Sequence, residues 1–142
     1  MNLKKENEES LRKAFEKDPS VQNTYELVRF YFKEKNNESY TKSEKVVEDY
    51  VDSLEFSREQ WWYEVVDEWW YSVKIFELRG IMRWRKEQYA LSRRAYINAL
   101  KIFNKNGYNK ESRKLLGPRW LCARRLKKGL RRADMKIPRY LR

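Results

Sequence analysis

Residues 61–76, WWYEVVDEWWYSVKIF, are the most aromatic stretch of the chain and indicate its fold class. On a helix these apolar side chains share one side, about half a circumference wide: Trp61, Trp62, Val65, Val66, Trp69, Trp70, Val73 and Phe76. The other half carries mainly charged residues, Glu64, Asp67, Glu68 and Lys74. An apolar arc this wide needs two neighbouring helices to cover it. The stretch therefore predicts the central helix of a bundle or helical array.

The tryptophan pairs have a second interpretation, as a platform on which nucleic-acid bases stack. The acids between them argue against it, because carboxylates repel phosphate. We therefore interpret Trp61, Trp69 and Phe76 as core residues.

Helical patterns continue toward the N-terminus, as expected for 142 residues with only 4 Gly and 3 Pro. We expect helices over residues 3–17, from Asp18-Pro19 to Phe32, and from the capping box Thr41-x-x-Glu44 to Leu54, with a turn at Asn36-Asn37. A second capping box, Ser57-x-x-Gln60, opens the Trp-rich helix.

Toward the C-terminus the Trp-rich helix is expected to continue through Gly80, a potential kink, as far as Phe103. Asn106-Gly107 predicts a left-handed helix stop, and Asn109 predicts the N-cap of a short helix over 110–116 that Gly117-Pro118 closes. A last helix, about 119–132, should carry Trp120, Ala123, Leu126 and Leu130 on one face, and residues 137–142 should form an extended arm.

These patterns together predict an all-α protein. We expect an irregular helical bundle or a short helical-hairpin array, with a long central Trp-rich helix and a basic C-terminal helix followed by an arm. The expected domains are a helical domain over residues 1–112, acidic up to about residue 78, and the basic helix with its arm over residues 113–142.

Charge is divided unevenly between the two halves of the chain. Residues 1–78 hold 12 Lys/Arg and 18 Asp/Glu, whereas residues 79–142 hold 21 Lys/Arg and only three acids, Glu87, Glu111 and Asp134. A single-sign cationic block repels itself unless a polyanion neutralises it, and release of counterions from phosphates then supplies affinity. The C-terminal half is therefore expected to bind a polyanion.

The residue types needed for most catalysis and metal binding are missing from the sequence. The chain has no histidine and one cysteine, Cys122, so it has neither a Ser–His or Cys–His pair nor a Cys-rich zinc site. Neighbouring acids such as Glu48–Asp49 diverge on a helix and are typical of a solvated face. We expect a non-enzymatic protein with no cofactor and no metal, and Cys122 as a semi-buried structural thiol.

The sequence also indicates the cellular compartment in which the protein is expected. The first residues, MNLKKENEE, are too charged for a secretory signal or a typical transit peptide. The apolar stretch 61–84 contains seven charges, so no transmembrane segment is expected. We expect an intracellular, reducing compartment, either the cytoplasm or an organelle matrix such as that of the mitochondrion.

Two parts of the chain resemble known helical proteins. Residues 96–103 with Asn106-Gly-Tyr-Asn and residues 112–116 resemble helical-hairpin repeats of the tetratricopeptide or pentatricopeptide kind, although no period of about 34 residues recurs. Residues 99–107 with Glu111, Arg113 and the basic run through Arg132 are similar to short basic two-helix ribosomal proteins.

The leading functional hypothesis is a structural subunit of a large ribonucleoprotein, with a ribosome, organellar ones included, as the first candidate. The expected partners are RNA and neighbouring protein subunits, and no small-molecule ligand is expected. Phosphate contacts are assigned to Arg119, Arg124, Arg125, Lys127, Lys128, Arg131, Arg132, Lys136, Arg139 and Arg142, with Trp120 or Tyr140 available to stack on bases.

Two other classes remain open from the sequence. One is a helical-repeat adaptor or accessory subunit of a multiprotein complex, including a membrane-associated one, whose basic tail contacts acidic protein or lipid. The other is a small helical DNA-binding or CRISPR-type subunit. A basic helical surface suits RNA, DNA and acidic partners alike, so composition does not separate them.

Overall fold

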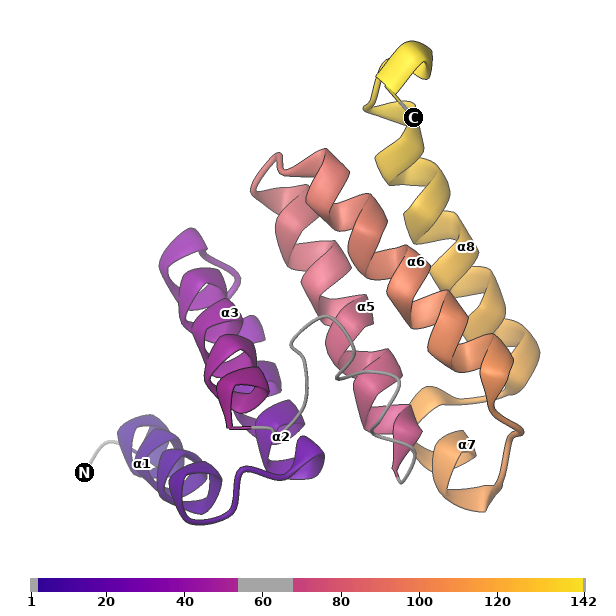
Figure 1. Cartoon of the computed structure of the whole chain (residues 1–142). Helices are drawn as coiled ribbons and strands as arrows, with labels where there is room; N and C mark the ends of the chain where they lie inside the picture. Colours follow the sequence, from indigo (N-terminus) through magenta and orange to yellow (C-terminus); the bar gives the residue numbers. More distant parts are fainter. Residues whose placement is uncertain (1–2, 54–67, 142) are drawn as a thin grey trace. The chain divides into compact units, whose positions relative to one another are not determined.

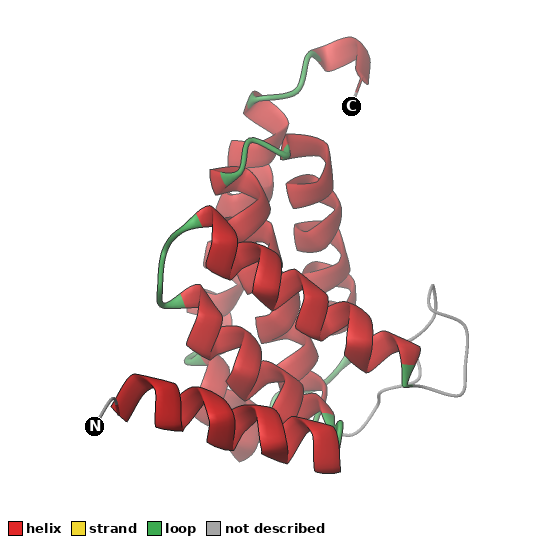
Figure 2. Cartoon of the chain, turned by 90° about the vertical axis from the view of Figure 1, so that its left-hand side faces the viewer, coloured by secondary structure: helices red, strands yellow, loops and turns green. Residues whose placement is uncertain are grey.

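The computed structural model describes residues 3–53 and 68–141, and this part of the chain is all-α. It forms seven α-helices and one short 3-10 helix, and no β-strand occurs among these residues (Figures 1 and 2). The prediction of an all-helical protein is confirmed. None of the helices in the described ranges combines the length and the apolar character that crossing a membrane requires.

The chain divides into two compact units, Met1–Trp61 and Trp62–Arg142. The boundary expected from charge, between residues 112 and 113, lies inside a helix of the second unit, α7 (Lys110–Leu116). The basic C-terminal helix is therefore packed within the second unit.

The first unit consists of α1 (Leu3–Lys17), α2 (Val21–Phe32) and α3 (Asn37–Asp52), with α2 in contact with both neighbours. Its core lies along α2, where Leu27, Val28 and Tyr31 are buried. The Tyr31 hydroxyl donates to Glu8 Oε1 on α1 at 2.7 Å, and Ser43 of α3 donates to the Val28 carbonyl at 3.0 Å. Polar side chains thus join the three helices at their buried contacts.

Two helix starts in this unit differ from the prediction. The N-cap of α2 is Ser20, whose hydroxyl accepts from the Asn23 amide at 3.1 Å, so neither Asp18 nor Pro19 begins the helix. The N-cap of α3 is Asn36, which accepts from the Ser39 amide at 2.8 Å. Thr41 therefore lies inside α3, because a stronger capping side chain stands five residues before it.

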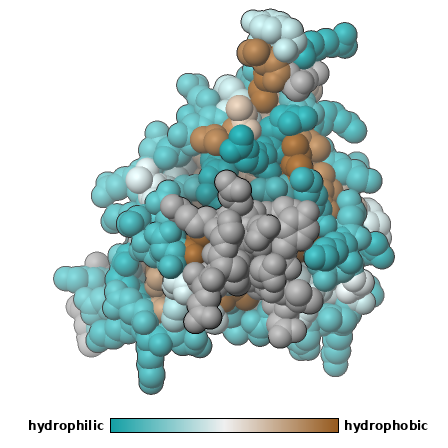
Figure 3. Space-filling view, viewed as in Figure 1, coloured by the Kyte–Doolittle hydropathy of each residue, from teal (hydrophilic) through white to brown (hydrophobic). Residues whose placement is uncertain are grey.

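The second unit contains α5 (Trp69–Arg85), α6 (Tyr89–Lys105), α7, α8 (Arg119–Met135) and the 3-10 helix η1 (Arg139–Leu141). In Figure 1, α6 lies between α5 and α8, and its packing against both helices forms most of the interior. Hydrophilic side chains cover most of the described surface in the view of Figure 3.

The Trp-rich helix is shorter at its C-terminal end than predicted. The chain leaves α5 after Arg85 and turns back at Lys86–Gln88, where Glu87 adopts the left-handed conformation with φ 62°. The turn is closed by the Gln88 amide, which donates to the Arg83 carbonyl at 2.8 Å. No Gly or Pro marks this position, so the sequence lacks the usual signal for a helix end.

Gly80 is a contact point between helices. The Tyr96 ring of α6 lies so close that a Cβ at Gly80 of α5 would be 2.6 Å from Cε2, and a Cβ at Gly129 of α8 would be 2.3 Å from Cε1. The Ser92 hydroxyl donates to the Gly80 carbonyl at 2.7 Å. Two glycines thus accommodate one buried aromatic ring, a role that helix propensity does not reveal.

The connections after α6 confirm the short helix over 110–116, its N-cap and its end at Gly117, and they correct three other predictions. Asn109 caps α7 through a reciprocal pair of hydrogen bonds with Ser112, at 2.8 Å each, as expected for an N-cap. Gly107 is not in the left-handed region; α6 ends where Asn106 becomes extended. The last helix runs to Met135, and the predicted extended arm instead forms η1.

Of the predicted tryptophan core, Trp69 and Phe76 are buried, whereas Trp61 lies outside the described residues. Val73 is also fully buried, and Trp70 is half-buried. The Trp69 ring contacts Tyr108 at a centroid distance of 5.9 Å, so it packs the start of α5 against the loop before α7. The assignment of this face to the core is confirmed for the described residues.

Replacing Trp69 by alanine should cost about 3–5 kcal/mol of unfolding free energy, because a large buried aromatic leaves a cavity. The measurement is denaturant unfolding of the full chain followed by circular dichroism. Trp120→Ala is the matched control, because Trp120 is 67% exposed and should change the midpoint little. Equal midpoints for the two variants would contradict the core assignment.

Candidate nucleic-acid interface

Helix α8 has one buried and one exposed side. The buried side consists of Cys122, Leu126, Gly129 and Ala133, which face the rest of the second unit. The predicted apolar face was partly wrong: Leu126 is buried, but Ala123 and Leu130 are half-buried, and Trp120 is among the most exposed aromatic side chains described. Gly129 on the buried side meets the Tyr96 ring of α6, and Trp120 lies at the surface with the basic residues.

The exposed side of α8 forms a basic groove, which we call the α8 groove. It has a volume of about 580 Å³ and is lined by Trp120, Ala123, Arg124, Lys127, Lys128 and Arg131. The spacing of these residues places Trp120, Arg124, Lys127 and Arg131 on successive turns of one stripe. No carboxylate among the described residues lines the groove.

The four cations of the α8 groove have no hydrogen bond or ion pair to any other side chain in the described ranges. The one acid of the C-terminal thirty residues, Asp134, is bound instead by Arg93 of α6, with Nε 2.6 Å from Oδ1. The groove therefore presents positive charge that the described part of the fold does not neutralise.

Arg125 has a different role from the one predicted. Its guanidinium Nε lies 3.0 Å from Oε2 of Glu77, a carboxylate on α5 that is only 5% exposed, and its Nη2 donates to the Leu116 carbonyl at 3.2 Å. Lys74 Nζ lies 3.1 Å from the other oxygen of Glu77. Arg125 therefore joins α8 to α5 and to the end of α7.

This arrangement determines the ionisation of Glu77. Burial by itself would raise the pKa of the Glu77 carboxyl, but the hydrogen bond from Arg125 and the charge of Lys74 outweigh it and hold the pKa below its ordinary value. Glu77 is thus a buried carboxylate that stays charged because two cations face it.

The remaining predicted site residues have mixed surroundings. Arg119 lies over the Phe103 ring at 5.8 Å, and Lys136 lies over the rings of Trp84 and Tyr89 at 5.9 and 5.8 Å. Arg132 borders a pocket of about 230 Å³ that Trp84 and Tyr96 also line. Arg139 and Tyr140 are exposed on η1, and Arg142 lies outside the described residues.

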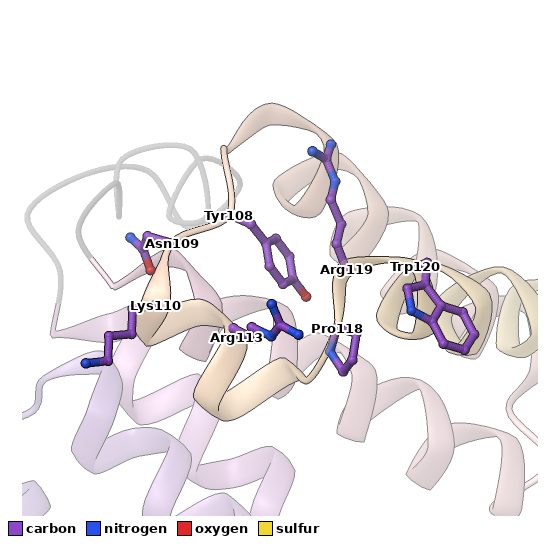
Figure 4. A pocket seen from close by; sticks show the side chains of 7 residues that line it. All are labelled: Tyr108, Asn109, Lys110, Arg113, Pro118, Arg119 and Trp120. Carbon is purple, nitrogen blue, oxygen red and sulfur yellow. The ribbon is translucent and has the colours of Figure 1, made fainter.

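A second hollow was not foreseen from the sequence. It lies where α7 meets the start of α8, has a volume of about 580 Å³, and is lined by Tyr108, Asn109, Lys110, Arg113, Pro118, Arg119 and Trp120 (Figure 4). We call it the α7–α8 pocket. In Figure 4 the Arg113 guanidinium is turned toward the Tyr108 ring, whereas the Lys110 amine points away. Between α7 and α8 the chain turns at Gly117, where φ is +78°.

The acidic residues and Cys122 are the side chains to consider for metal binding or nucleophilic chemistry. The described residues contain no group of three Cys, Asp or Glu side chains that could hold a metal ion. Cys122 is fully buried, and burial raises the pKa of its thiol. Such a thiol is a poor nucleophile.

Comparison with protein-family models, with curated proteins and with solved structures found no match to this chain. The residues and geometry described above are therefore the basis for assigning a function.

Proposed function

We propose that this protein is a non-enzymatic RNA-binding subunit of a ribonucleoprotein and that it contacts RNA phosphates through the α8 groove. The observation that supports the proposal is a row of cations on the exposed side of a packed helix, Arg124, Lys127, Lys128 and Arg131, which have no ion pair within residues 3–53 and 68–141. A helix anchored by its opposite side fixes the spacing of the backbone positions from which these side chains extend. A row of cations at regular spacing is suited to a phosphate backbone.

Helices α3 and α8 differ in the arrangement of their charged residues. On α3 of the first unit, Lys42 lies near Glu38 and Lys45 near Asp49, which are opposite-charge pairs four residues apart. On α8 the residues four apart are both cations, as in Arg124 and Lys128. Like-charge pairs at this spacing destabilise a helix by about 0.2–0.5 kcal/mol each. A bound polyanion would reverse that cost.

Recognition of this kind would depend on backbone and shape. Arginine grips phosphate with a planar pair of N–H donors, and the α8 groove contains no side chain typical of base reading such as Asn or Gln. We therefore propose binding that tolerates many sequences, within an assembly whose other proteins contact the rest of the chain. A ribosome, cytoplasmic or organellar, is the first assembly to examine.

Neutralising three groove cations tests this proposal directly. In the triple variant Arg124→Gln, Lys127→Gln and Arg131→Gln, RNA affinity should fall, and the slope of log affinity against log salt should decrease by about 2–3, because each lost phosphate contact removes about 0.7–0.9. The matched control carries Lys13→Gln, Lys17→Gln and Lys33→Gln, exposed lysines of the first unit. Both variants should keep the wild-type unfolding midpoint.

Equal loss of RNA binding in the two triple variants would show that net charge alone is responsible, which contradicts a site on α8. Purification of the tagged full chain with and without RNase separates the remaining classes. An RNase-resistant complex would favour the protein-adaptor function, and tighter binding to DNA than to RNA would favour a DNA-binding subunit. Deleting residues 113–142 is unsuitable, since it removes α8 from the core of the second unit.

A further inference from the structure

Trp120 stands between two basic hollows. It lines both the α7–α8 pocket and the α8 groove, each about 580 Å³ in volume. Its indole is 67% exposed and makes no ring contact or hydrogen bond with another described side chain. We propose that a single-stranded segment of RNA crosses α8 here, with one unpaired base stacked on Trp120 and the phosphates on either side of that base in the two hollows. The inference rests on the proposed RNA-binding function and specifies its ligand.

The exposed indole is the first part of the argument. The other tryptophans described on α5, Trp69, Trp70 and Trp84, are buried or half-buried against their own unit. An aromatic face left in water beside cations is a suitable stacking surface, because every base has a π-face and its phosphate is attracted by the neighbouring charges. Stacking of a base on an aromatic residue contributes about 1–3 kcal/mol.

The α7–α8 pocket contributes a cation on the α7 side of Trp120. Arg113 lines it and has no carboxylate partner among the described side chains, whereas its neighbour Lys114 lies 3.8 Å from Glu111 and lines neither hollow. The volume of the pocket falls within the range of about 300–1,000 Å³ typical of small-ligand sites, so it has room for a phosphate with its sugar. Arg119 is held over Phe103, and the Lys110 amine points away from the pocket in Figure 4, which leaves Arg113 as the principal phosphate ligand.

The α8 groove contributes cations along α8 on the C-terminal side of Trp120. Arg124 lies one helical turn beyond Trp120, about 6 Å along the axis, and Arg131 lies about 16 Å beyond it. A strand that follows this stripe would keep its phosphates against arginine and lysine. In a duplex the bases are stacked on each other inside the helix and cannot reach Trp120, so the arrangement favours single strands.

The experiment compares an RNA strand without self-complementarity with the same strand annealed to its complement, using the full chain at fixed salt. Trp120→Ala should weaken binding of the single strand by about 5- to 150-fold, which corresponds to loss of one stacked base, and should leave duplex binding unchanged. Trp120→Phe should restore most of the affinity. Met135→Ala, at an exposed apolar residue of α8 that lines neither hollow, should have no effect.

A second pair of variants tests the α7–α8 pocket. Arg113→Gln should lower single-strand affinity and reduce the salt slope by about 0.7, whereas Lys114→Gln should do neither. The stacked-base inference is overturned if Trp120→Ala weakens binding of the single strand and of the duplex equally, or if it weakens neither. The proposed function stands in both cases. If the wild-type chain binds neither form of RNA, the proposed function fails as well.

Discussion

Replacing Arg125 by glutamate is expected to unfold the second unit, whereas the same replacement at the adjacent Arg124 should leave it folded. Both substitutions change the net charge equally and both lie on α8. The difference arises because Arg125 neutralises the buried carboxylate of Glu77, while Arg124 faces solvent in the α8 groove.

The size of the effect follows from the surroundings of Glu77. Removing one partner of a buried ion pair typically costs about 3–5 kcal/mol, because the remaining charge is left without compensation. Lys74 stays near Glu77, so loss of Arg125 alone should cost an unfolding free energy toward the lower end of that range. A glutamate at the same position adds repulsion between two carboxylates. Against a total stability of about 5–15 kcal/mol, this is sufficient to unfold a small helical unit.

Thermal unfolding of Arg125→Glu, Arg125→Met and Arg124→Glu provides the measurement. Acid gives an independent readout: because the folded-state pKa of Glu77 is lowered, its contribution is present above about pH 4.3 and is lost as the pH falls through the folded-state pKa. In Arg125→Met the pKa of Glu77 should rise, so this acid-induced loss should diminish. Similar melting temperatures for Arg125→Glu and Arg124→Glu would contradict the assigned role.

Gly129→Ala is expected to destabilise the second unit, although helix propensity predicts the opposite. Alanine is preferred over glycine inside a helix by about 1 kcal/mol. At Gly129, however, the new Cβ would lie 2.3 Å from both Cε1 and Cζ of Tyr96, and this rigid ring is buried between two helices. Overpacking of this kind typically costs about 1–3 kcal/mol, so a net loss of stability is expected.

A double variant separates the two effects. Tyr96→Leu removes the ring atoms that a Cβ at Gly129 would meet, at its own cost in stability. In that background Gly129→Ala should become neutral or stabilising, which denaturant unfolding of the four chains would measure as a coupling energy. A rise in stability when Gly129→Ala is made in the wild-type chain would refute the close contact.

Local sequence patterns were sufficient for much of the secondary structure. The periodic apolar residues predicted helices throughout the described ranges, and Asn109 predicted the start of α7. Trp69 and Phe76 could be assigned to the core because a wide apolar arc on a helix must be covered. The uneven division of charge between the two halves of the chain likewise predicted a basic C-terminal helix. These features depend on residues close together in the chain, so spacing alone reveals them.

Only the tertiary structure decided which basic residues are available to a ligand. Arg124 and Arg125 are equivalent in the sequence, but Arg125 is paired with Glu77, 48 positions away, and Arg124 is not. Gly80 and Gly129 lie 49 positions apart and accommodate the same Tyr96 ring. The turn at Glu87 has no local signal, and it is what brings α6 against α5. The ion pair and the two glycine contacts join residues that are distant in the chain, which the packing of the helices selects and local periodicity does not encode.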